Sequence, residues 1–295
     1  MTSDHQEADS QQLAKDAGRS RFLPGTTIEI IRELEFKEPP RHVLFDFDGT
    51  LSLIREGWPS VMVPMMVEIL LETGTDESPR QLHDYCYQYV MQLCGKQTVY
   101  QMIRLAEEVK ARGGTPKDPW LYKQIYHDRL MDHIGHRREA LRSGEASPEE
   151  MLVPRSLDIL GALRDSGVAL YVASGTDQRY VEEEARLLTL DRYFGEHIYG
   201  AQKEYKKFSK QAVIDHILTE NQIHGSLLLG FGDGYVEVQN VKLSGGTAIA
   251  VASDEAGRSG RPDQWKRDRL IGVGADIVIP DFKDYEPLLR YIWGD

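Results

Sequence analysis

The chain has 295 residues, of which 41% are hydrophobic and 28% are charged. This length suits one large or two modest globular domains, and the composition excludes bulk disorder. The 35 basic and 47 acidic residues give a formal net charge of −12, which argues against a nucleic acid or an anionic membrane as partner. Two cysteines are too few for a disulfide framework or a four-thiolate zinc site.

The first 24 residues are polar and end at Pro24-Gly25, so we interpret residues 1–24 as a flexible N-terminal tail. The tail lacks the apolar segment of a secretory signal. The longest apolar run, Val61 to Leu71, is far shorter than the roughly 20 residues of a membrane-spanning helix. We therefore expect a cytoplasmic protein without a membrane partner, and the sequence leaves its oligomeric state open.

Short apolar runs without alternation predict buried parallel strands. There are five of them: His42–Phe47, Val168–Ala173, Ser226–Phe231, Thr247–Ala252 and Asp276–Pro280. Helix-like segments accompany the last four of these strands, at Ser156–Arg164, Asp177–Leu190 and Ser209–Thr219. Such alternation is typical of an α/β fold with a doubly wound, Rossmann-like parallel sheet.

The interval between the first and second predicted strands breaks this alternation. Helical spacing of apolar residues there predicts helices at Gln81–Leu93, Thr98–Ala111 and Tyr122–Ala140. We expect residues 57–150 to form an inserted α-helical domain over the strand ends, and residues 25–56 and 151–295 to form the core.

Acidic and hydroxyl side chains follow three of the predicted strands, at the sheet edge where α/β proteins bind ligands. Asp46 and Asp48 end the first strand, and Asp233 ends the third, with Glu237 four residues later. Strand periodicity places Asp46 and Asp48 on the same side, where they repel each other unless a cation intervenes. Carboxylates of this kind, together with a substrate phosphate, suit Mg²⁺.

A phosphate group at this edge also needs donors and positive charge. The second predicted strand ends in Ser174-Gly175-Thr176, which offers a hydroxyl and a close backbone approach. The segment KEYKKFSK supplies four lysines, Lys203, Lys206, Lys207 and Lys210, and a lysine at this edge could bind a phosphate.

In order along the chain, these segments resemble the four motifs of the haloacid dehalogenase (HAD) superfamily of phosphohydrolases. The first motif is similar to Asp46-Phe47-Asp48-Gly49-Thr50, the second to Ser174 and the fourth to Gly232-Asp233 with Glu237. Lys210, at the start of a predicted helix, best fits the third-motif lysine, although Lys206 and Lys207 remain alternatives. The resemblance implies the Rossmann-like core and a helical C1-type cap formed by the insertion.

The resemblance also implies roles for these residues. Asp46 would be the nucleophile that forms an aspartyl-phosphate, and Asp48 the general acid and base. Thr50, Ser174, Gly175 and Lys210 would bind the phosphoryl group. Mg²⁺ would be held by Asp46, Asp48 through its carbonyl, Asp233 and Glu237, which stands where the family often has a second aspartate.

The expected activity is hydrolysis of a small phosphorylated metabolite, such as a sugar phosphate or a phosphoglycolate-like or phosphoserine-like ester. A phosphomutase on the same site and a non-catalytic metabolite-binding module are alternatives. Arg55, Glu56 and Trp58 follow the first motif, and Lys96 follows Gly95 in a turn between predicted helices. Each could contact the substrate or only shape the hinge and turns of the insertion.

Overall fold

The structure is a computed structural model that describes residues 9–14, 20–202, 204 and 208–294. Its centre is a sheet in the order β1-β2-β8-β7-β6-β3-β4-β5. The six strands from β8 to β5 pair in parallel, whereas β1 and β2 run antiparallel at one edge. The strands are β1 Arg21–Phe22, β2 Glu29–Ile30, β3 His42–Phe45, β4 Ala169–Asp177, β5 Ile198–Ala201, β6 Leu228–Gly232, β7 Thr247–Val251 and β8 Ile277–Ile279.

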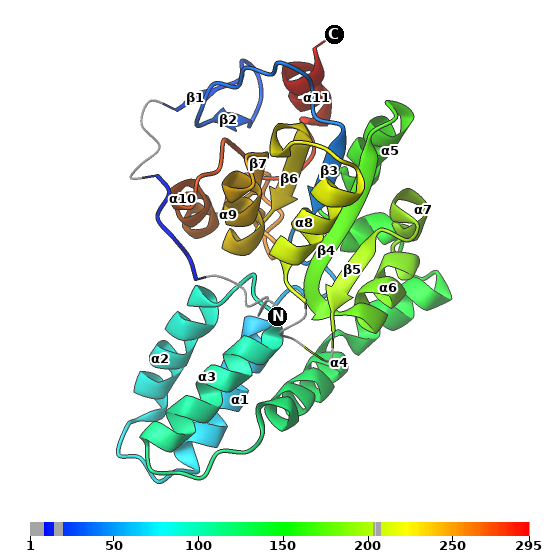
Figure 1. Ribbon diagram of the computed structural model, residues 1–295. Helices are drawn as coiled ribbons and strands as arrows, with labels where there is room; N and C mark the ends of the chain where they lie inside the picture. Colours follow the sequence, from blue (N-terminus) through cyan, green and yellow to red (C-terminus); the bar gives the residue numbers. More distant parts are fainter. Residues whose placement is uncertain (1–8, 15–19, 203, 205–207, 295) are drawn as a thin grey trace.

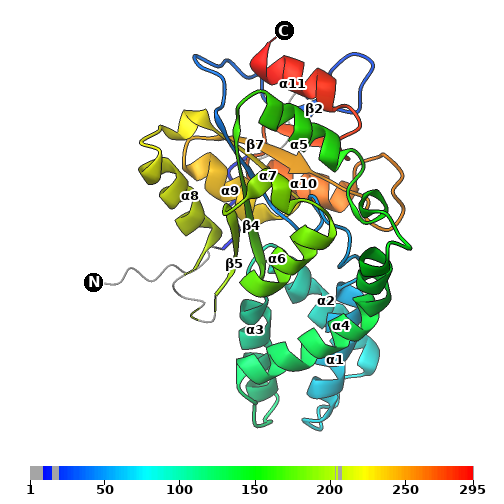
Figure 2. The same cartoon turned by 90° about the vertical axis from the view of Figure 1, so that its right-hand side faces the viewer.

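Helices cover both faces of the sheet (Figures 1 and 2). Apolar side chains of α5, α6, α7 and α11 pack in one core cluster with Phe45, and those of α8, α9 and α10 pack in a second cluster with Leu44. Neighbouring residues of β3 thus face opposite layers. The core helices are α5 Ser156–Asp165, α6 Gln178–Leu187, α7 Asp191–Phe194, α8 Lys210–Glu220, α9 Tyr235–Leu243, α10 Gln264–Gly272 and α11 Tyr285–Trp293. The predicted doubly wound α/β fold is confirmed.

Four helices between β3 and α5 form a separate lobe at the carboxyl ends of the parallel strands (Figure 1). They are α1 Pro59–Leu71, α2 Pro79–Gln92, α3 Thr98–Ala111 and α4 Pro119–Ser143. A 3₁₀ turn at Pro148–Met151 leads back to the core, and a second one, at Gly225–Leu227, precedes β6. The last three helices of the lobe match the predicted segments. The first one was not predicted, since its apolar run contains Pro64, a residue that normally interrupts helices.

The N-terminal segment differs from the predicted free tail where the structure describes it. The backbone N–H groups of Leu13 and Ala14 donate to the carbonyl of Gly272, and β1 adds a strand to the sheet. These described residues therefore make contacts with the core that the prediction of a flexible tail over residues 1–24 did not include. Two-residue strands such as β1 and β2 are too short to show periodicity, which is why the sequence did not reveal this edge.

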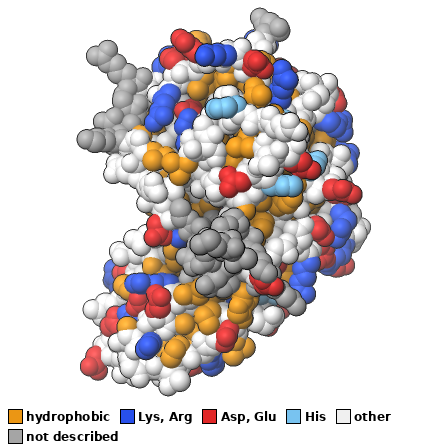
Figure 3. Space-filling view, viewed as in Figure 1, with side chains coloured by type: hydrophobic (Ala, Val, Ile, Leu, Met, Phe, Trp, Pro, Cys, Tyr) orange, Lys and Arg blue, Asp and Glu red, His pale blue; other side chains and the backbone are white. Residues whose placement is uncertain are grey.

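In the space-filling view a notch separates the helical lobe from the core, and lysine and arginine side chains are interspersed with acidic ones on the face shown (Figure 3). Among the described residues, no helix combines the length and apolar character needed to cross a bilayer.

Candidate active site

The loop Asp46–Thr50 follows β3 and begins the site. The Asp46 N–H donates to the Phe231 carbonyl (2.9 Å), which ties the loop to β6. Gly49 has a φ of +76°, and a Cβ atom there would lie 2.2 Å from Asp233 Oδ2. Only glycine fits this position, because any side chain would clash with the aspartate and strain the backbone. The glycine therefore lets the loop approach Asp233 closely.

Lys210 is the lysine that reaches the first aspartate. Ser209 caps α8 by accepting from the Ala212 N–H (3.0 Å), which places Lys210 in the first turn. The Lys210 side chain is buried, and its Nζ lies 2.8 Å from Asp46 Oδ1. Lys206 and Lys207, the alternatives, lie outside the described residues.

Glu237, which the sequence predicts as a metal ligand, contacts the lysine of the third motif segment. Its buried carboxylate is in direct ionic contact with the Lys210 ammonium. It packs against Gly232 and Gly234, and it does not line the cavity described below. Glu237, in the first turn of α9, therefore lies between the end of β6 and Lys210 in the first turn of α8.

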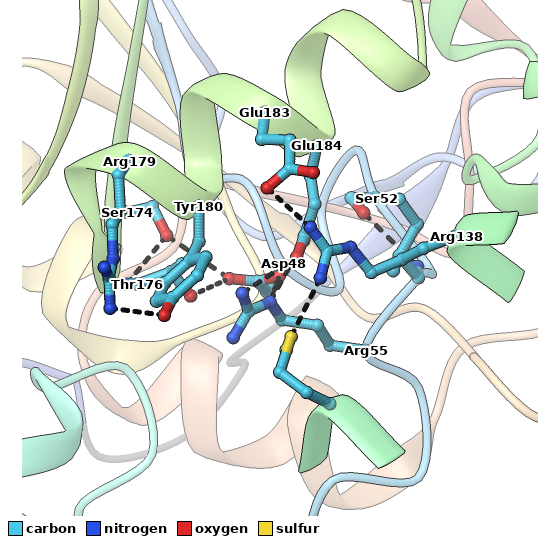
Figure 4. A network of polar contacts seen from close by, with 12 residues as sticks. Asp48, Ser52, Arg55, Arg138, Ser174, Thr176, Arg179, Tyr180, Glu183 and Glu184 are labelled. Carbon is cyan, nitrogen blue, oxygen red and sulfur yellow. Dashed lines mark hydrogen bonds and ion pairs between the residues drawn. The ribbon is translucent and has the colours of Figure 1, made fainter. Parts of the chain in front are cut away.

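Asp48 lies within a polar network drawn in Figure 4. Its Oδ2 accepts from the hydroxyls of Ser174 (3.2 Å) and Thr176 (2.9 Å), both at the end of β4. The Arg55 guanidinium lies 3.6 Å from Asp48 Oδ1. Asp48 thus joins the first and second motif segments, as the sequence predicted from their places at neighbouring strand ends.

Arg55 is held by a buried partner that the sequence did not reveal. Its guanidinium donates two hydrogen bonds to the Glu184 carboxylate of α6, at 2.8 and 3.0 Å. Both side chains are largely buried. A fork-shaped contact of this kind fixes the guanidinium plane, so Arg55 faces Asp48 in one orientation.

Asp233 is surrounded by a second set of polar groups. Its N–H donates to the Thr50 hydroxyl (2.9 Å), which gives Thr50 a role in joining the two loops. Its Oδ2 accepts from Lys266 Nζ of α10 at 2.8 Å. The same ammonium donates to Glu255 Oε1 at 2.6 Å. Neither Lys266 nor Glu255 belongs to a motif, and no sequence signal marked them.

These groups open into a cavity of about 100 Å³ between the core and the helical lobe. The core contributes side chains from all four motif segments, and the lobe contributes apolar and polar ones. Lining residues include Asp46, Asp48, Gly175, Lys210, Asp233 and Glu255 from the core, and Met62, Cys94, Gln101 and Tyr126 from the lobe, with Arg55, Glu56 and Trp58 at the connection between them.

The turn between α2 and α3 covers the cavity. Gly95 packs against Gly234, and the Lys96 carbonyl lies against Gly175, so the turn touches two of the strand-end loops. The Lys96 ammonium pairs with Asp9 of the N-terminal segment at 2.6 Å. Gln97 donates from Nε2 to the Phe208 carbonyl at 2.7 Å. The helical lobe is thus closed onto the core.

The carboxylates of the site carry more charge than its cations neutralise. The acids are Asp46, Asp48, Glu184, Asp233, Glu237 and Glu255, and the cations in contact with them are Arg55, Lys210 and Lys266. Burial and the nearby Asp233 and Asp48 raise the pKa of Asp46 to about 7, although Lys210 opposes this. A further cation would therefore be stabilised here.

The donors also fit a hard cation. Asp48 Oδ1 is buried without a hydrogen-bond partner, and carboxylate oxygens are ligands that Mg²⁺ accepts. Within the ranges that the structure describes, no three or more histidine, cysteine, aspartate or glutamate side chains are gathered closely enough to hold a metal ion by themselves. Backbone carbonyl, water or substrate oxygens would have to complete the coordination.

Comparisons with known proteins identify the family. The model of the haloacid dehalogenase-like hydrolase family matches residues 40–242. A 5′-nucleotidase of Pseudomonas aeruginosa is 25% identical over 233 residues, covering 77% of this chain and 91% of that protein.

Two solved structures are similar in fold. A predicted phosphoglycolate phosphatase from Haemophilus somnus has a TM-score of 0.55 at 14% identity, over 84% of this chain and 97% of that one. A HAD family hydrolase from Deinococcus radiodurans, with bound phosphate and sodium, has a TM-score of 0.51 at 17% identity, over 86% of this chain and 96% of that one. Since the family model spans more than half of the residues and all four motif segments, the chain belongs to the haloacid dehalogenase-like hydrolases.

Proposed function

We propose that this hydrolase is a Mg²⁺-dependent phosphatase that cleaves a small phosphomonoester through an aspartyl-phosphate on Asp46. The observation that supports this most directly is the buried contact of 2.8 Å between Lys210 Nζ and Asp46 Oδ1, two residues that line the cavity. An ammonium beside the carboxylate can bind a phosphoryl oxygen at the moment that Asp46 attacks phosphorus.

In the first step, an Asp46 oxygen forms a bond to phosphorus and the bond from phosphorus to the leaving alcohol oxygen breaks. Protonated Asp48 gives its proton to that oxygen. The Thr176 hydroxyl, which donates to Asp48 at 2.9 Å, holds the carboxyl group of Asp48 at the end of β4, and the Ser174 hydroxyl, which donates to Asp48 at 3.2 Å, turns to the phosphoryl group instead when substrate binds. Lys210, Ser174 and the backbone of Gly175 bind the phosphoryl oxygens.

In the second step, Asp48 as a carboxylate takes a proton from water, and the water oxygen forms a bond to phosphorus. The bond between phosphorus and Asp46 breaks, which returns the Asp46 carboxylate and releases phosphate. Thr50 keeps the nucleophile loop against Asp233 throughout, through its hydrogen bond of 2.9 Å to the Asp233 N–H.

The divalent ion would be bound by the carboxylates of Asp46 and Asp233 and by the carbonyl of Asp48. When bound, Mg²⁺ supplies positive charge to the phosphoryl group. We assign Glu237 to positioning Lys210 rather than to the metal, because its carboxylate contacts the ammonium directly and does not line the cavity.

We further propose that residues 57–150 act as a C1-type cap, with 25–56 and 151–295 as the catalytic core. The α2–α3 turn lies on the strand-end loops, and Arg269 of α10 donates to the Met91 and Gln92 carbonyls at the end of α2. A substrate larger than the closed cavity would need these contacts to open.

Phosphate release from a panel of esters in the presence of Mg²⁺ tests the proposal. The panel contains sugar phosphates, phosphoglycolate, phosphoserine and nucleoside 5′-monophosphates, the last because one similar protein is a 5′-nucleotidase. We expect turnover of at least one ester, abolished by chelation and by Asp46→Asn. Asp165→Asn, at an exposed position on α5, is the matched control.

Two outcomes would contradict the proposal. Activity that survives Asp46→Asn would exclude the nucleophile. Phosphoryl transfer within a substrate that requires a bisphosphate activator and releases no phosphate would indicate a phosphomutase instead.

A further inference from the structure

Glu255 and Lys266, which belong to none of the four motif segments, form a compact charged cluster with Asp233. Lys266 Nζ lies 2.8 Å from Asp233 Oδ2 and 2.6 Å from Glu255 Oε1. It also lies 3.1 Å from Ser253 Oγ, which donates to the Gly49 carbonyl at 2.6 Å. The cluster therefore connects α10 to the loop that carries Asp46 and Asp48.

The cluster is built into the fold. Asp263 caps α10 by accepting from the Lys266 N–H (2.9 Å), which fixes where the lysine leaves the helix. The Lys266 side chain is 11% exposed, and the Asp233 side chain is 9% exposed. Glu255 and Asp233 line the cavity beside Asp46 and Asp48. Charges in such a poorly hydrated place interact strongly.

The Lys266 ammonium weakens the Asp233 carboxylate as a metal ligand, because the ammonium and the divalent ion compete for the same negative charge. Asp233 and Lys266 alone would form a neutral pair. Glu255 restores one negative charge to the cluster, since two carboxylates share one ammonium. Its carboxylate also draws the ammonium partly away from Asp233.

We propose that Glu255 and Lys266 are positioning residues that set the affinity of the catalytic cation at Asp233: Lys266 orients Asp233 through Oδ2, and Glu255 keeps the cluster negative so that a divalent ion still binds. This inference rests on the proposed function, and the ligand that it concerns is the divalent ion of that function. Neither residue needs to contact the substrate for this role.

Calorimetric titration of the full-length protein with Mg²⁺, without substrate, tests the inference in a double-mutant cycle. Glu255→Gln leaves a neutral cluster, and we expect Mg²⁺ affinity to fall about 10- to 100-fold, the usual range for outer-shell partners of a metal ligand. Lys266→Met adds one negative charge relative to wild type, and affinity should rise.

The double variant Glu255→Gln/Lys266→Met restores a single negative charge on Asp233, and its affinity should return to within about threefold of wild type. The double variant also tests whether a change in affinity arises from misfolding, since Asp233 is the one carboxylate of the cluster that it leaves unpaired. Lys283→Met is the control for the loss of a lysine from an acid elsewhere in the chain, because Lys283 pairs with Asp281 at 3.2 Å from a half-exposed position.

The outcomes separate this inference from the proposed function. Equal losses of affinity in all three variants would overturn it, because they would indicate a purely structural cluster. Unchanged affinity in Glu255→Gln would overturn it as well. If the wild-type protein releases phosphate but binds no Mg²⁺, or if Asp233→Asn binds Mg²⁺ normally, the metal site itself is wrong and the inference fails with it.

Discussion

The core and the helical lobe contribute to the same cavity in different ways. In the core, parallel pairing of β4, β3 and β6 brings the strand-end residues Ser174, Asp46 and Asp233 together, and Lys210 joins them from the first turn of α8. In the lobe, the contributing residues come from a turn and from several helices, and tertiary packing alone places them. A sheet edge therefore specifies chemistry through local sequence, whereas the lobe specifies the shape of the cavity through long-range contacts.

The largest effect on activity should come from the loss of Lys210. Lys210→Met removes the ammonium beside Asp46, and we expect kcat/KM to fall about 10²- to 10³-fold, as for other donors to a developing charge. Steady-state phosphate release measures this change.

Lys242→Met is the control, because it also removes a lysine that pairs with a buried aspartate. Lys242 Nζ pairs with Asp276 Oδ2 at 2.8 Å, away from the cavity. This variant should unfold at lower urea concentration yet keep its kcat. Equal activity losses in the two variants would indicate that stability, rather than chemistry, explains the effect of Lys210.

A smaller effect on kcat is expected for Glu237, the acid that contacts Lys210. Glu237→Gln keeps the shape but weakens the contact with Lys210, and we expect kcat to fall about tenfold, the equivalent of one charge-assisted hydrogen bond. Mg²⁺ affinity, measured by calorimetry, should stay unchanged. A large loss of Mg²⁺ affinity would instead restore the prediction that Glu237 is a metal ligand.

The sequence predicted the parts of the site that local patterns encode. Five apolar runs mark parallel strands, and the residues just after three of them form the site, so Asp46, Asp48, Ser174 and Asp233 could be found without coordinates. Lys210 could also be found, because Ser209 marks the start of its helix.

Other parts depend on contacts between residues far apart in the chain. Arg55 and Glu184 are separated by 129 positions, and Lys266 meets Asp233 across 33. Neither pair leaves a periodic or motif signal. The same limit applies to the N-terminal segment: its contact with Gly272 consists of hydrogen bonds from backbone N–H groups, which any residue except proline could donate.

The contacts that close the lobe should affect binding more than chemistry. Arg269→Ala removes the donors to the Met91 and Gln92 carbonyls, so we expect the lobe to open more easily and KM to rise about threefold to tenfold with kcat nearly unchanged. Steady-state kinetics provide the test, with Arg261→Ala at an exposed loop position as the control. A fall in kcat alone would indicate that Arg269 acts on the catalytic residues instead.

The smallest expected effect is a pH dependence at the contact between lobe and core. His127 of α4 stacks on Tyr180 of α6, with ring centroids 4.2 Å apart. Burial, together with the nearby positive charge of Arg55, lowers the pKa of His127 to about 4, whereas an unfolded histidine has a pKa near 6.5. Between pH 6.5 and 4 the unfolded chain therefore binds more protons at this residue than the folded one.

The free energy of unfolding should consequently decrease as the pH falls through this window, and the contribution of His127 is present in full only above pH 6.5. We expect a loss of about 1 kcal/mol, because solvent screens a ring that is only half-buried. Urea unfolding at several pH values measures it. His127→Phe keeps the stacked ring and should remove this part of the pH dependence, whereas His83→Phe, on the exposed side of α2, should preserve it. Identical pH profiles for wild type and His127→Phe would show that the lobe and the core remain in contact independently of the charge on this residue.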